Sequence, residues 1–231
     1  MSKVWSFGCS HSTGHELGTG ITRQELTNWY KTHTVGYDFD TARQTKNYEQ
    51  IALSEWNDPR HNPHNQELAF PGVFARELGL ELIAKGKSGV GIDHVMKTYY
   101  ECKDKIAEDD IVLFEVPPIY RYTDLAGTPQ QLALFTGKEI YAPSTFTLEL
   151  LTDAVIKMLY YEHPNVFVVD VGAGIEKSLD ERYLLTSTNM RDVEIETYGN
   201  HTLVRYPMGH FMEEIHEIFG KLLVKEYEKK S

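Results

Sequence analysis

The sequence has few cysteines and no long hydrophobic run, and both shortages exclude classes of protein. Its 231 residues include 2 cysteines, Cys9 and Cys102, which are far apart and offer no disulfide framework. No apolar stretch approaches the ~20 residues that a membrane-spanning helix needs. The apolar run at residues 4–7 ends at Gly8, which is too early for a secretory signal. We therefore expect a cytoplasmic protein that makes no membrane contact.

Basic residues are also scarce. The chain has 23 Lys and Arg against 34 Asp and Glu, which gives a formal net charge of −11. Such a charge repels nucleic-acid phosphates and anionic surfaces, so we expect no nucleic-acid partner and disfavour strongly anionic ligands. Apolar residues, by contrast, make up 41% of the chain. At this length they can supply the core of a single domain, residues 1–231, without disulfide or metal support.

Most of the sequence alternates short apolar strands with amphipathic helices. Strands are expected at residues 4–7, 80–84, 111–114 and 166–169, and helices at 71–79, 92–106, 144–159 and from 211 onward. The strands at 111–114 and 166–169 are apolar throughout, as parallel strands covered on both faces are. The pattern predicts an α/β fold, namely a three-layer α/β/α sandwich with a mainly parallel central sheet of the flavodoxin-like type.

Two segments depart from this alternation. Residues 12–68 are polar and aromatic, with weak helical patterns and a stretch rich in Pro, His and Asn at 58–65, which predicts a long loop-rich insertion in the domain. Residues 193–197 alternate in polarity, and Gly199-Asn200 is suited to a tight turn into residues 202–204. We therefore expect a β-hairpin there, with His201 in the turn.

The candidate functional residues follow strands or precede the last helix, where parallel sheets bind ligands. Ser10 comes directly after the first strand, among small residues. A serine hydroxyl becomes a nucleophile only beside a base, and without one Ser10 would simply cap a helix. Gly89 lies in a glycine-rich loop that lacks the lysine of a phosphate-binding loop. His210 precedes the last helix as a candidate base, whereas His216, inside that helix, is expected to pack.

The first two loops resemble sequence blocks of the SGNH/GDSL hydrolases. The run Phe7-Gly8-Cys9-Ser10 resembles their Gly-Asp-Ser block, with Cys9 in place of the aspartate. Residues 70–79 look like the helix before the second block, and residues 84–89 are similar to that block itself. A glycine of the second block donates its N–H to an oxyanion in the family, and Gly89 takes its position.

The closing block of the family can be aligned with this sequence in two ways. His210 and His216 have the spacing of the pattern His-Pro-Asn-x-x-Gly-His, without its Pro, Asn and Gly. Alternatively, Gly209-His210 matches the final Gly-His, which would make His201 the catalytic histidine. We place His210 first and keep His201 as the alternative base.

Two residues of the family pattern are missing. The third block normally ends in Gly-x-Asn-Asp, whose asparagine is an oxyanion donor, but here the strand runs into Glu115 and two prolines. Loss of one such donor can lower turnover by ~10²–10³. Arg121 is a candidate replacement or a contact for an anionic part of the substrate. The aspartate expected shortly before the histidine is also missing, and a backbone carbonyl or Glu213 could orient the imidazole instead.

The resemblance implies a serine esterase that needs no cofactor. His210 would take the proton of Ser10, and the N–H groups of Ser10 and Gly89 would hold the oxyanion. The expected substrate is a small neutral ester, with an O-acetyl group on a carbohydrate as one candidate. A non-catalytic binding or structural protein on the same fold is the main alternative. A metal site at Cys9, His11 and His15 is a weaker one, and we expect no metal.

Overall fold

The computed structural model describes residues 2–14, 17, 24, 63–87, 90–117, 121–123, 129–131, 145–163, 165–171, 184–199 and 211–230. For residues 63–64, 121–123, 129–131 and 145–149 it describes the backbone alone. Within these ranges no helix is long and apolar enough to cross a membrane.

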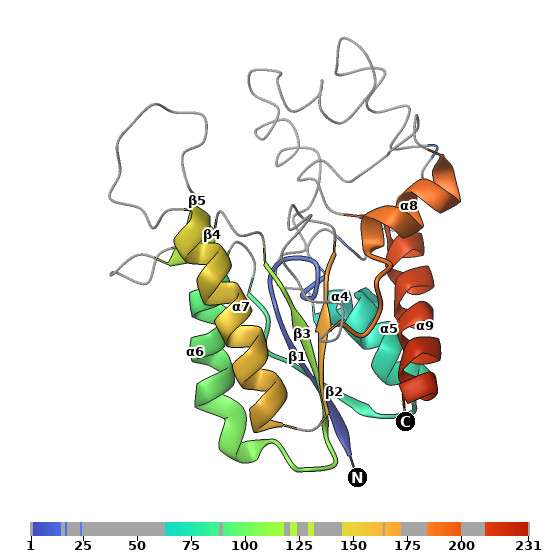
Figure 1. Cartoon of the computed structure of the whole chain (residues 1–231). Helices are drawn as coiled ribbons and strands as arrows, with labels where there is room; N and C mark the ends of the chain where they lie inside the picture. Colours follow the sequence, from blue (N-terminus) through green and yellow to red (C-terminus); the bar gives the residue numbers. More distant parts are fainter. Residues whose placement is uncertain are drawn as a thin grey trace, which may run out of the picture.

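Four short strands lie side by side in one parallel sheet (Figure 1). They are β1 (Lys3–Phe7), β2 (Glu81–Ala84), β3 (Ile111–Glu115) and β6 (Val166–Val169), in the order β2-β1-β3-β6. Every residue of β3 is buried, because this strand is central and both faces of the sheet are covered. The predicted strands and their parallel arrangement are confirmed.

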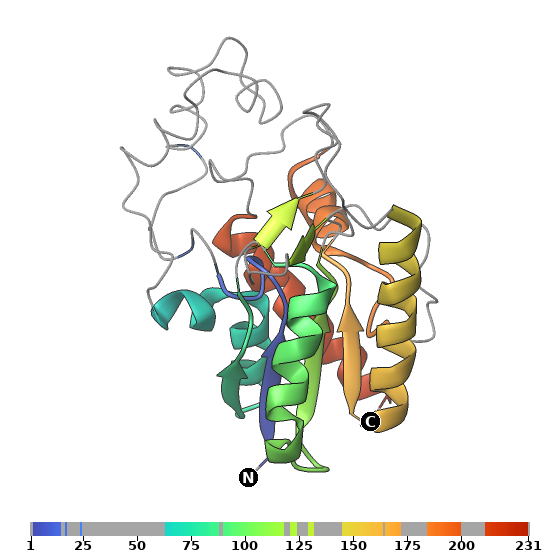
Figure 2. The ribbon, with the colours of Figure 1, turned by 90° about the vertical axis from the view of Figure 1, so that its left-hand side faces the viewer.

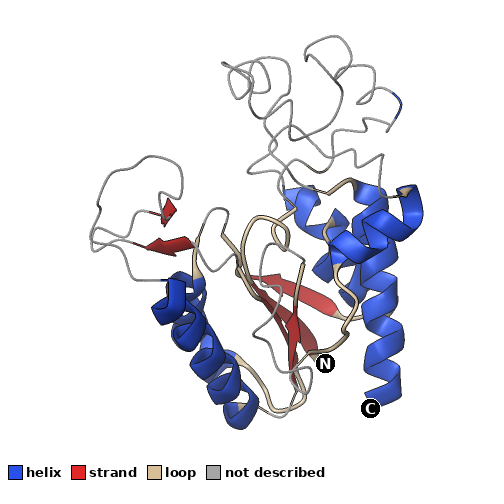
Figure 3. Cartoon of the chain, turned by 45° about the horizontal axis from the view of Figure 1, so that its top comes forward, coloured by secondary structure: helices blue, strands red, loops and turns tan. Residues whose placement is uncertain are grey.

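Helices cover both faces of the sheet (Figures 2 and 3). One face carries α6 (Ile92–Cys102), which continues into a 3₁₀ turn at Lys103–Lys105, and α7 (Thr145–Glu162). The other carries α5 (Phe70–Glu77), α8 (Met190–Tyr198) and α9 (Glu213–Lys230), with α4 (Pro63–Leu68) beside α5. The expected α/β/α sandwich is confirmed, as are the helices predicted near residues 71–79, 92–106, 144–159 and from 211 onward.

The sheet divides the core into two parts, because successive side chains of β3 point to opposite faces of the sheet. Ile111 and Leu113 pack under α5 and α9, and Val112 and Phe114 pack under α6 and α7. A separate two-stranded antiparallel ladder joins β4 (Arg121–Thr123) to β5 (Pro129–Gln131).

The hairpin predicted from residue 193 is wrong in its first strand, because Met190–Tyr198 form α8. The Asn189 side chain accepts a hydrogen bond from the Asp192 N–H, and the Asp192 carboxylate accepts one from the Asn189 N–H. This capping box starts the helix, and it outweighs the short alternation of polarity that follows. Gly199, with φ of 78°, ends α8 in a conformation that suits glycine. His201 and residues 202–204 lie outside the described residues.

The end of the predicted insertion is also more regular than expected. Residues 63–68 form α4, although the Pro/His/Asn-rich stretch at 58–65 was expected to turn as a loop. Proline is tolerated at the start of a helix because its missing N–H has no helical partner there. Most of residues 12–68 lie outside the described ranges, so the insertion and the single domain at 1–231 stay predictions.

Candidate active site

The loop that follows β1 turns back at the carboxyl end of the sheet (Figure 1). We call residues 8–14 the serine loop, because Ser10 lies near its centre. The Thr13 N–H donates to the Cys9 carbonyl at 3.3 Å, and the Thr13 hydroxyl donates to the Ser10 carbonyl at 3.0 Å. These short-range bonds hold the loop as a tight turn, as the small residues of the sequence suggested.

A carboxylate from the neighbouring strand anchors the serine loop. Glu115, the last residue of β3, accepts hydrogen bonds at Oε2 from the Cys9 N–H at 2.9 Å and the Ser12 N–H at 3.0 Å. Its Oε1 accepts the Cys9 thiol proton at 2.8 Å. Glu115 is only 1% exposed, so these contacts satisfy a carboxyl group that water hardly reaches.

Burial dominates the electrostatics of Glu115. Removal from water disfavours the charged form and raises the pKa of this carboxyl above its usual value. The hydrogen bonds from Cys9 and Ser12 act in the opposite direction and offset only part of this effect. In the sequence Glu115 stood out only as a departure from the family pattern. The sequence feature that could have indicated this role is an acidic residue directly after the four apolar residues 111–114.

The loop after β2 runs alongside the serine loop. The Lys85 N–H donates to the Ser6 carbonyl at 2.8 Å, and the Lys87 N–H donates to the Gly8 carbonyl at 3.0 Å. A side chain at Gly86 would place its Cβ 2.7 Å from the Ser12 hydroxyl, so glycine permits this close approach. The loops after β1 and β2 therefore meet at one edge, as predicted from the parallel sheet. Gly89, two residues beyond Lys87, lies outside the described residues.

Ser10 itself is almost covered, with 2% of its surface exposed. Its hydroxyl lies 3.9 Å from the Cys9 sulfur. The next residue, His11, packs its ring against Phe211, with 5.2 Å between the ring centroids. The segment before α9 therefore touches the serine loop.

The structure describes only part of the predicted set of site residues, and it does not test their roles. Ser10 is described, whereas His210 and His201 lie outside the described residues. For Arg121 the backbone is described, at the start of β4 opposite Gln131, but the side chain is not. The pairing of Ser10 with a histidine thus stays a prediction.

His216 has the packing role that the sequence suggested. It is buried in α9, and its Nδ1 accepts the Phe70 N–H at 3.1 Å. Its ring stacks on that of Phe70, with centroids 6.2 Å apart and planes 11° apart. The N–H groups in the first turn of a helix have no helical acceptor, so His216 serves as a cap for α5 from another helix.

Metal-ligating side chains do not gather within the described ranges, where no group of three or more His, Cys, Asp or Glu could hold an ion. His15, one of the three residues considered for such a site, lies outside those ranges. Neither Cys9 nor Cys102 forms a disulfide, and the Cys9 thiol donates to Glu115.

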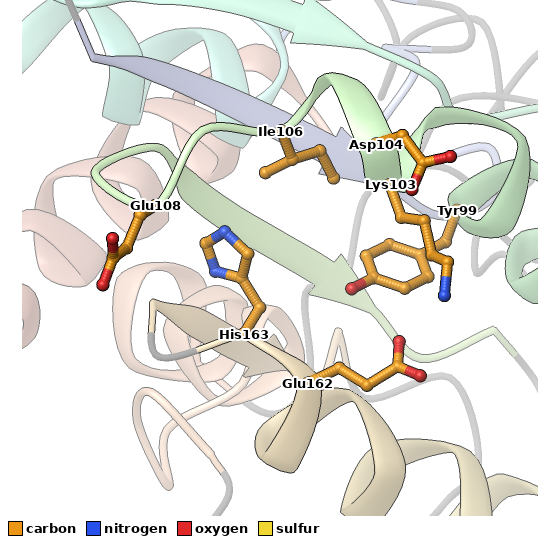
Figure 4. Close-up of a pocket in the computed structure, with 7 residues that line it drawn as sticks. All are labelled: Tyr99, Lys103, Asp104, Ile106, Glu108, Glu162 and His163. Atoms are coloured by element: carbon orange, nitrogen blue, oxygen red, sulfur yellow. The ribbon is translucent and has the colours of Figure 1, made fainter.

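A pocket of about 520 Å³ lies at the opposite edge of the sheet, near the C-terminal ends of α6 and α7 (Figure 4). Tyr99, Glu162 and His163 are among the residues that line it. His163 accepts the Asn165 N–H at Nδ1, at 3.3 Å, and its Nε2 lies 3.1 Å from the Ala107 carbonyl. It therefore ties together the turns before β3 and β6. The pocket is at the amino ends of these strands, away from the serine loop.

Comparison with known proteins informs the fold of this chain. No protein-family model matches the chain, and no curated protein matches it. Among solved structures it is similar to a carbohydrate esterase whose active site is described as displaying "divergent catalytic and non-catalytic binding functions". The TM-score is 0.50 at 11% sequence identity, over 100% of this chain and 69% of the other. The chain thus has an α/β fold with an all-parallel central sheet, consistent with a flavodoxin-like fold.

Proposed function

We propose that this protein is a serine hydrolase that cleaves a small neutral ester. The observation that supports this most directly is the contact between His11 and Phe211, with ring centroids 5.2 Å apart. Ser10 precedes one of these residues and His210 precedes the other. Consecutive Cα atoms are about 3.8 Å apart, so the nucleophile and its base are each one chain step from this contact.

The proposed reaction is acyl transfer through Ser10. His210 takes the hydroxyl proton as Ser10 Oγ attacks the ester carbonyl, and the same histidine then protonates the leaving alcohol. Water, deprotonated by the histidine, then attacks the acyl carbon. The bond from that carbon to Ser10 Oγ breaks, and the histidine returns the proton to Oγ, which restores the serine. The N–H groups of Ser10 and Gly89 hold the oxyanion.

Several finer assignments belong to this proposal. His201 is the alternative base, and Arg121 is the substitute oxyanion donor or the contact for an anionic part of the substrate. The similar solved structure is that of a carbohydrate esterase, which favours an O-acyl group on a sugar as substrate. The net charge of −11 favours a neutral one. The scarcity of cysteine supports a cytoplasmic setting.

A second candidate function is non-catalytic binding on the same fold. The observation in its favour is the 2% exposure of Ser10, because a substrate must reach the nucleophile. The absence of the family's oxyanion asparagine and triad aspartate points the same way. Binding without turnover would leave Ser10 unreactive towards any acylating or phosphonylating reagent.

The deciding experiment is to treat the purified protein with p-nitrophenyl acetate, acetylated sugars and a fluorophosphonate. We expect ester turnover and covalent labelling, both lost in Ser10→Ala and in the variant of the true base, His210→Ala or His201→Ala. Ser6→Ala is the matched control, because it removes an equally buried serine hydroxyl from β1. Absence of turnover and labelling in the wild-type protein, or labelling of Ser10→Ala at the wild-type rate, would show that the proposal is wrong.

A further inference from the structure

The Glu115 carboxyl group holds the serine loop at points on both sides of Ser10. A single oxygen, Oε2, accepts the N–H of Cys9 at 2.9 Å and the N–H of Ser12 at 3.0 Å. These two residues flank Ser10 and His11, so the backbone between them is fixed at both ends to one atom. Two hydrogen bonds to a common acceptor define the position of a short segment far better than either bond alone.

The residues around Glu115 fit closely to its carboxyl group. The Cys9 thiol donates to its second oxygen at 2.8 Å, so both oxygens have donors. Gly8 lies so close that an added Cβ would overlap the Glu115 side chain. At the first residue of the serine loop, the carboxyl group that holds the loop thus leaves room only for glycine.

The opposite end of β3 offers a direct comparison. Asp110 is 3% exposed and, like Glu115, accepts two backbone N–H groups, from Lys3 at 2.7 Å and Ala107 at 2.9 Å. It also accepts the Trp5 indole N–H at 2.8 Å. Both carboxyl groups accept backbone N–H groups, but the donors of Asp110 lie at the amino edge of the sheet. Only Glu115 holds the segment that contains Ser10.

We propose that Glu115 is the positioning residue of Ser10, which sets the place of its hydroxyl and N–H through the backbone of the serine loop. This inference rests on the proposed function, because Ser10 must be the nucleophile for its place to matter to turnover. The Glu115 carboxyl group bonds to Cys9 and Ser12 and not to the Ser10 hydroxyl, so it acts through the loop. A displacement of about 1 Å in such a group can lower the rate by roughly 100-fold.

The length and the carbonyl oxygen of the side chain carry this role, whereas its charge does not. Glu115→Gln keeps an oxygen at the place of Oε2 and retains both backbone bonds, so turnover stays within about threefold of wild type. Glu115→Ala leaves the N–H groups of Cys9 and Ser12 without an acceptor, and kcat falls by roughly 100-fold with little change in KM.

The experiment compares Glu115→Ala and Glu115→Gln with the matched control Asp110→Ala. Ester turnover and fluorophosphonate labelling are measured under conditions in which circular dichroism shows each variant to be folded. Both alanine variants lose stability, but only Glu115→Ala loses kcat and labelling rate, and Glu115→Gln restores them. The proposal would be overturned if Glu115→Ala had the same kcat as Asp110→Ala. It would also be overturned if Glu115→Gln were as inactive as Glu115→Ala.

Two further measurements keep the test decisive. If Glu115→Ala does not fold, Glu115→Asp replaces it. This side chain keeps the charge but is one methylene too short, so it must be at least about tenfold slower than Glu115→Gln. A faster Asp variant overturns the proposal.

If the wild-type protein neither turns over esters nor reacts with the fluorophosphonate, the proposed function is wrong, and amide hydrogen exchange then tests positioning alone. Faster exchange at Cys9 and Ser12 in the Glu115 variant, but not in Asp110→Ala, supports it. Equal exchange in the two variants overturns it.

Discussion

The rings of His11 and Phe211 lie with their centroids 5.2 Å apart and their planes tilted by 49°. Phe211 is buried and belongs to the core cluster beneath α5 and α9, whereas His11 belongs to the serine loop. The contact therefore joins the first loop of the sheet to the segment that leads into the last helix. A catalytic pair in this fold would need these two segments to meet.

Replacing Phe211 tests whether this contact supports the site. We expect Phe211→Ala to lower the free energy of unfolding by about 3–5 kcal/mol, because a buried ring is lost. Labelling of Ser10 by a fluorophosphonate should slow as well. Phe219→Ala is the matched control, since Phe219 is equally buried in the same cluster but packs on Phe70. Equal labelling rates in the two folded variants would contradict a role of the Phe211 contact in the site.

The His216 cap yields a prediction about stability alone. His216→Leu removes the acceptor of the Phe70 N–H, and we expect it to cost about 1–3 kcal/mol in urea unfolding. His216→Asn places an amide oxygen near the position of Nδ1 and should recover part of that loss. Reactivity of Ser10 should be unchanged in both folded variants. Loss of labelling in His216→Asn would instead indicate a catalytic role for this histidine.

The elements of the fold were predictable because they depend on local pattern. The unbroken apolar runs at 111–114 and 166–169 are compatible with a buried parallel strand, and the structure has β3 and β6 there. The prediction failed at residues 193–197, where an alternation of five residues is too short to distinguish a strand from a helix. The capping pair Asn189 and Asp192 was the stronger signal, because it fixes the first turn of α8.

The candidate site was less predictable, because its contacts join residues that are far apart in the sequence. Ser10 could be found from its place after a strand. The bonds that hold its loop come from Glu115, 106 positions beyond Cys9, and no local pattern encodes such a pair. In the family block an aspartate stands where this chain has Cys9. Here the carboxyl group comes from the neighbouring strand and accepts the thiol of Cys9 itself.

The ionised Asp110 carboxylate should stabilise the fold at pH values above its pKa. Burial alone would raise that pKa, but hydrogen bonds from Ala107, Trp5 and Lys3 outweigh it and hold the pKa of Asp110 below its usual value. As the pH falls, Asp110 is therefore protonated in the unfolded chain before it is protonated in the folded protein. Its stabilising effect is lost as the pH approaches the pKa of the folded state. We expect Asp110→Asn to cost about 1.5–3 kcal/mol at neutral pH and much less in acid. Urea unfolding at both pH values measures this, and a cost independent of pH would contradict it.

The contribution of Glu115 to stability should change with pH in the opposite direction, because burial raises the pKa of its carboxyl group. Between the usual carboxyl pKa and the raised value, the folded protein holds a proton that the unfolded chain has released. Stability contributed by this group therefore falls as the pH rises through that window. Glu115→Gln, which does not titrate, should be least stable relative to wild type in acid and gain on it as the pH rises. A wild-type minus Glu115→Gln difference that grows with pH would contradict the shift.

Replacing Gly8 tests the serine loop while Glu115 itself is left unsubstituted. In Gly8→Ala the new Cβ overlaps the Glu115 side chain, so either the loop or the carboxylate must move. We expect a cost of about 1–3 kcal/mol, as for other overpacked sites, and slower labelling of Ser10.

Gly220→Ala is the matched control for that overlap, because its Cβ would lie 2.5 Å from the Cβ of Val73 at the contact between α5 and α9. Both variants introduce one methyl group into a filled space, so both should lose stability. Only Gly8→Ala displaces the residue that holds Cys9 and Ser12, so only it should lose reactivity at Ser10. If Gly220→Ala, while folded, slows labelling as much as Gly8→Ala, then general loosening of the core explains the effect and the loop does not depend on Glu115.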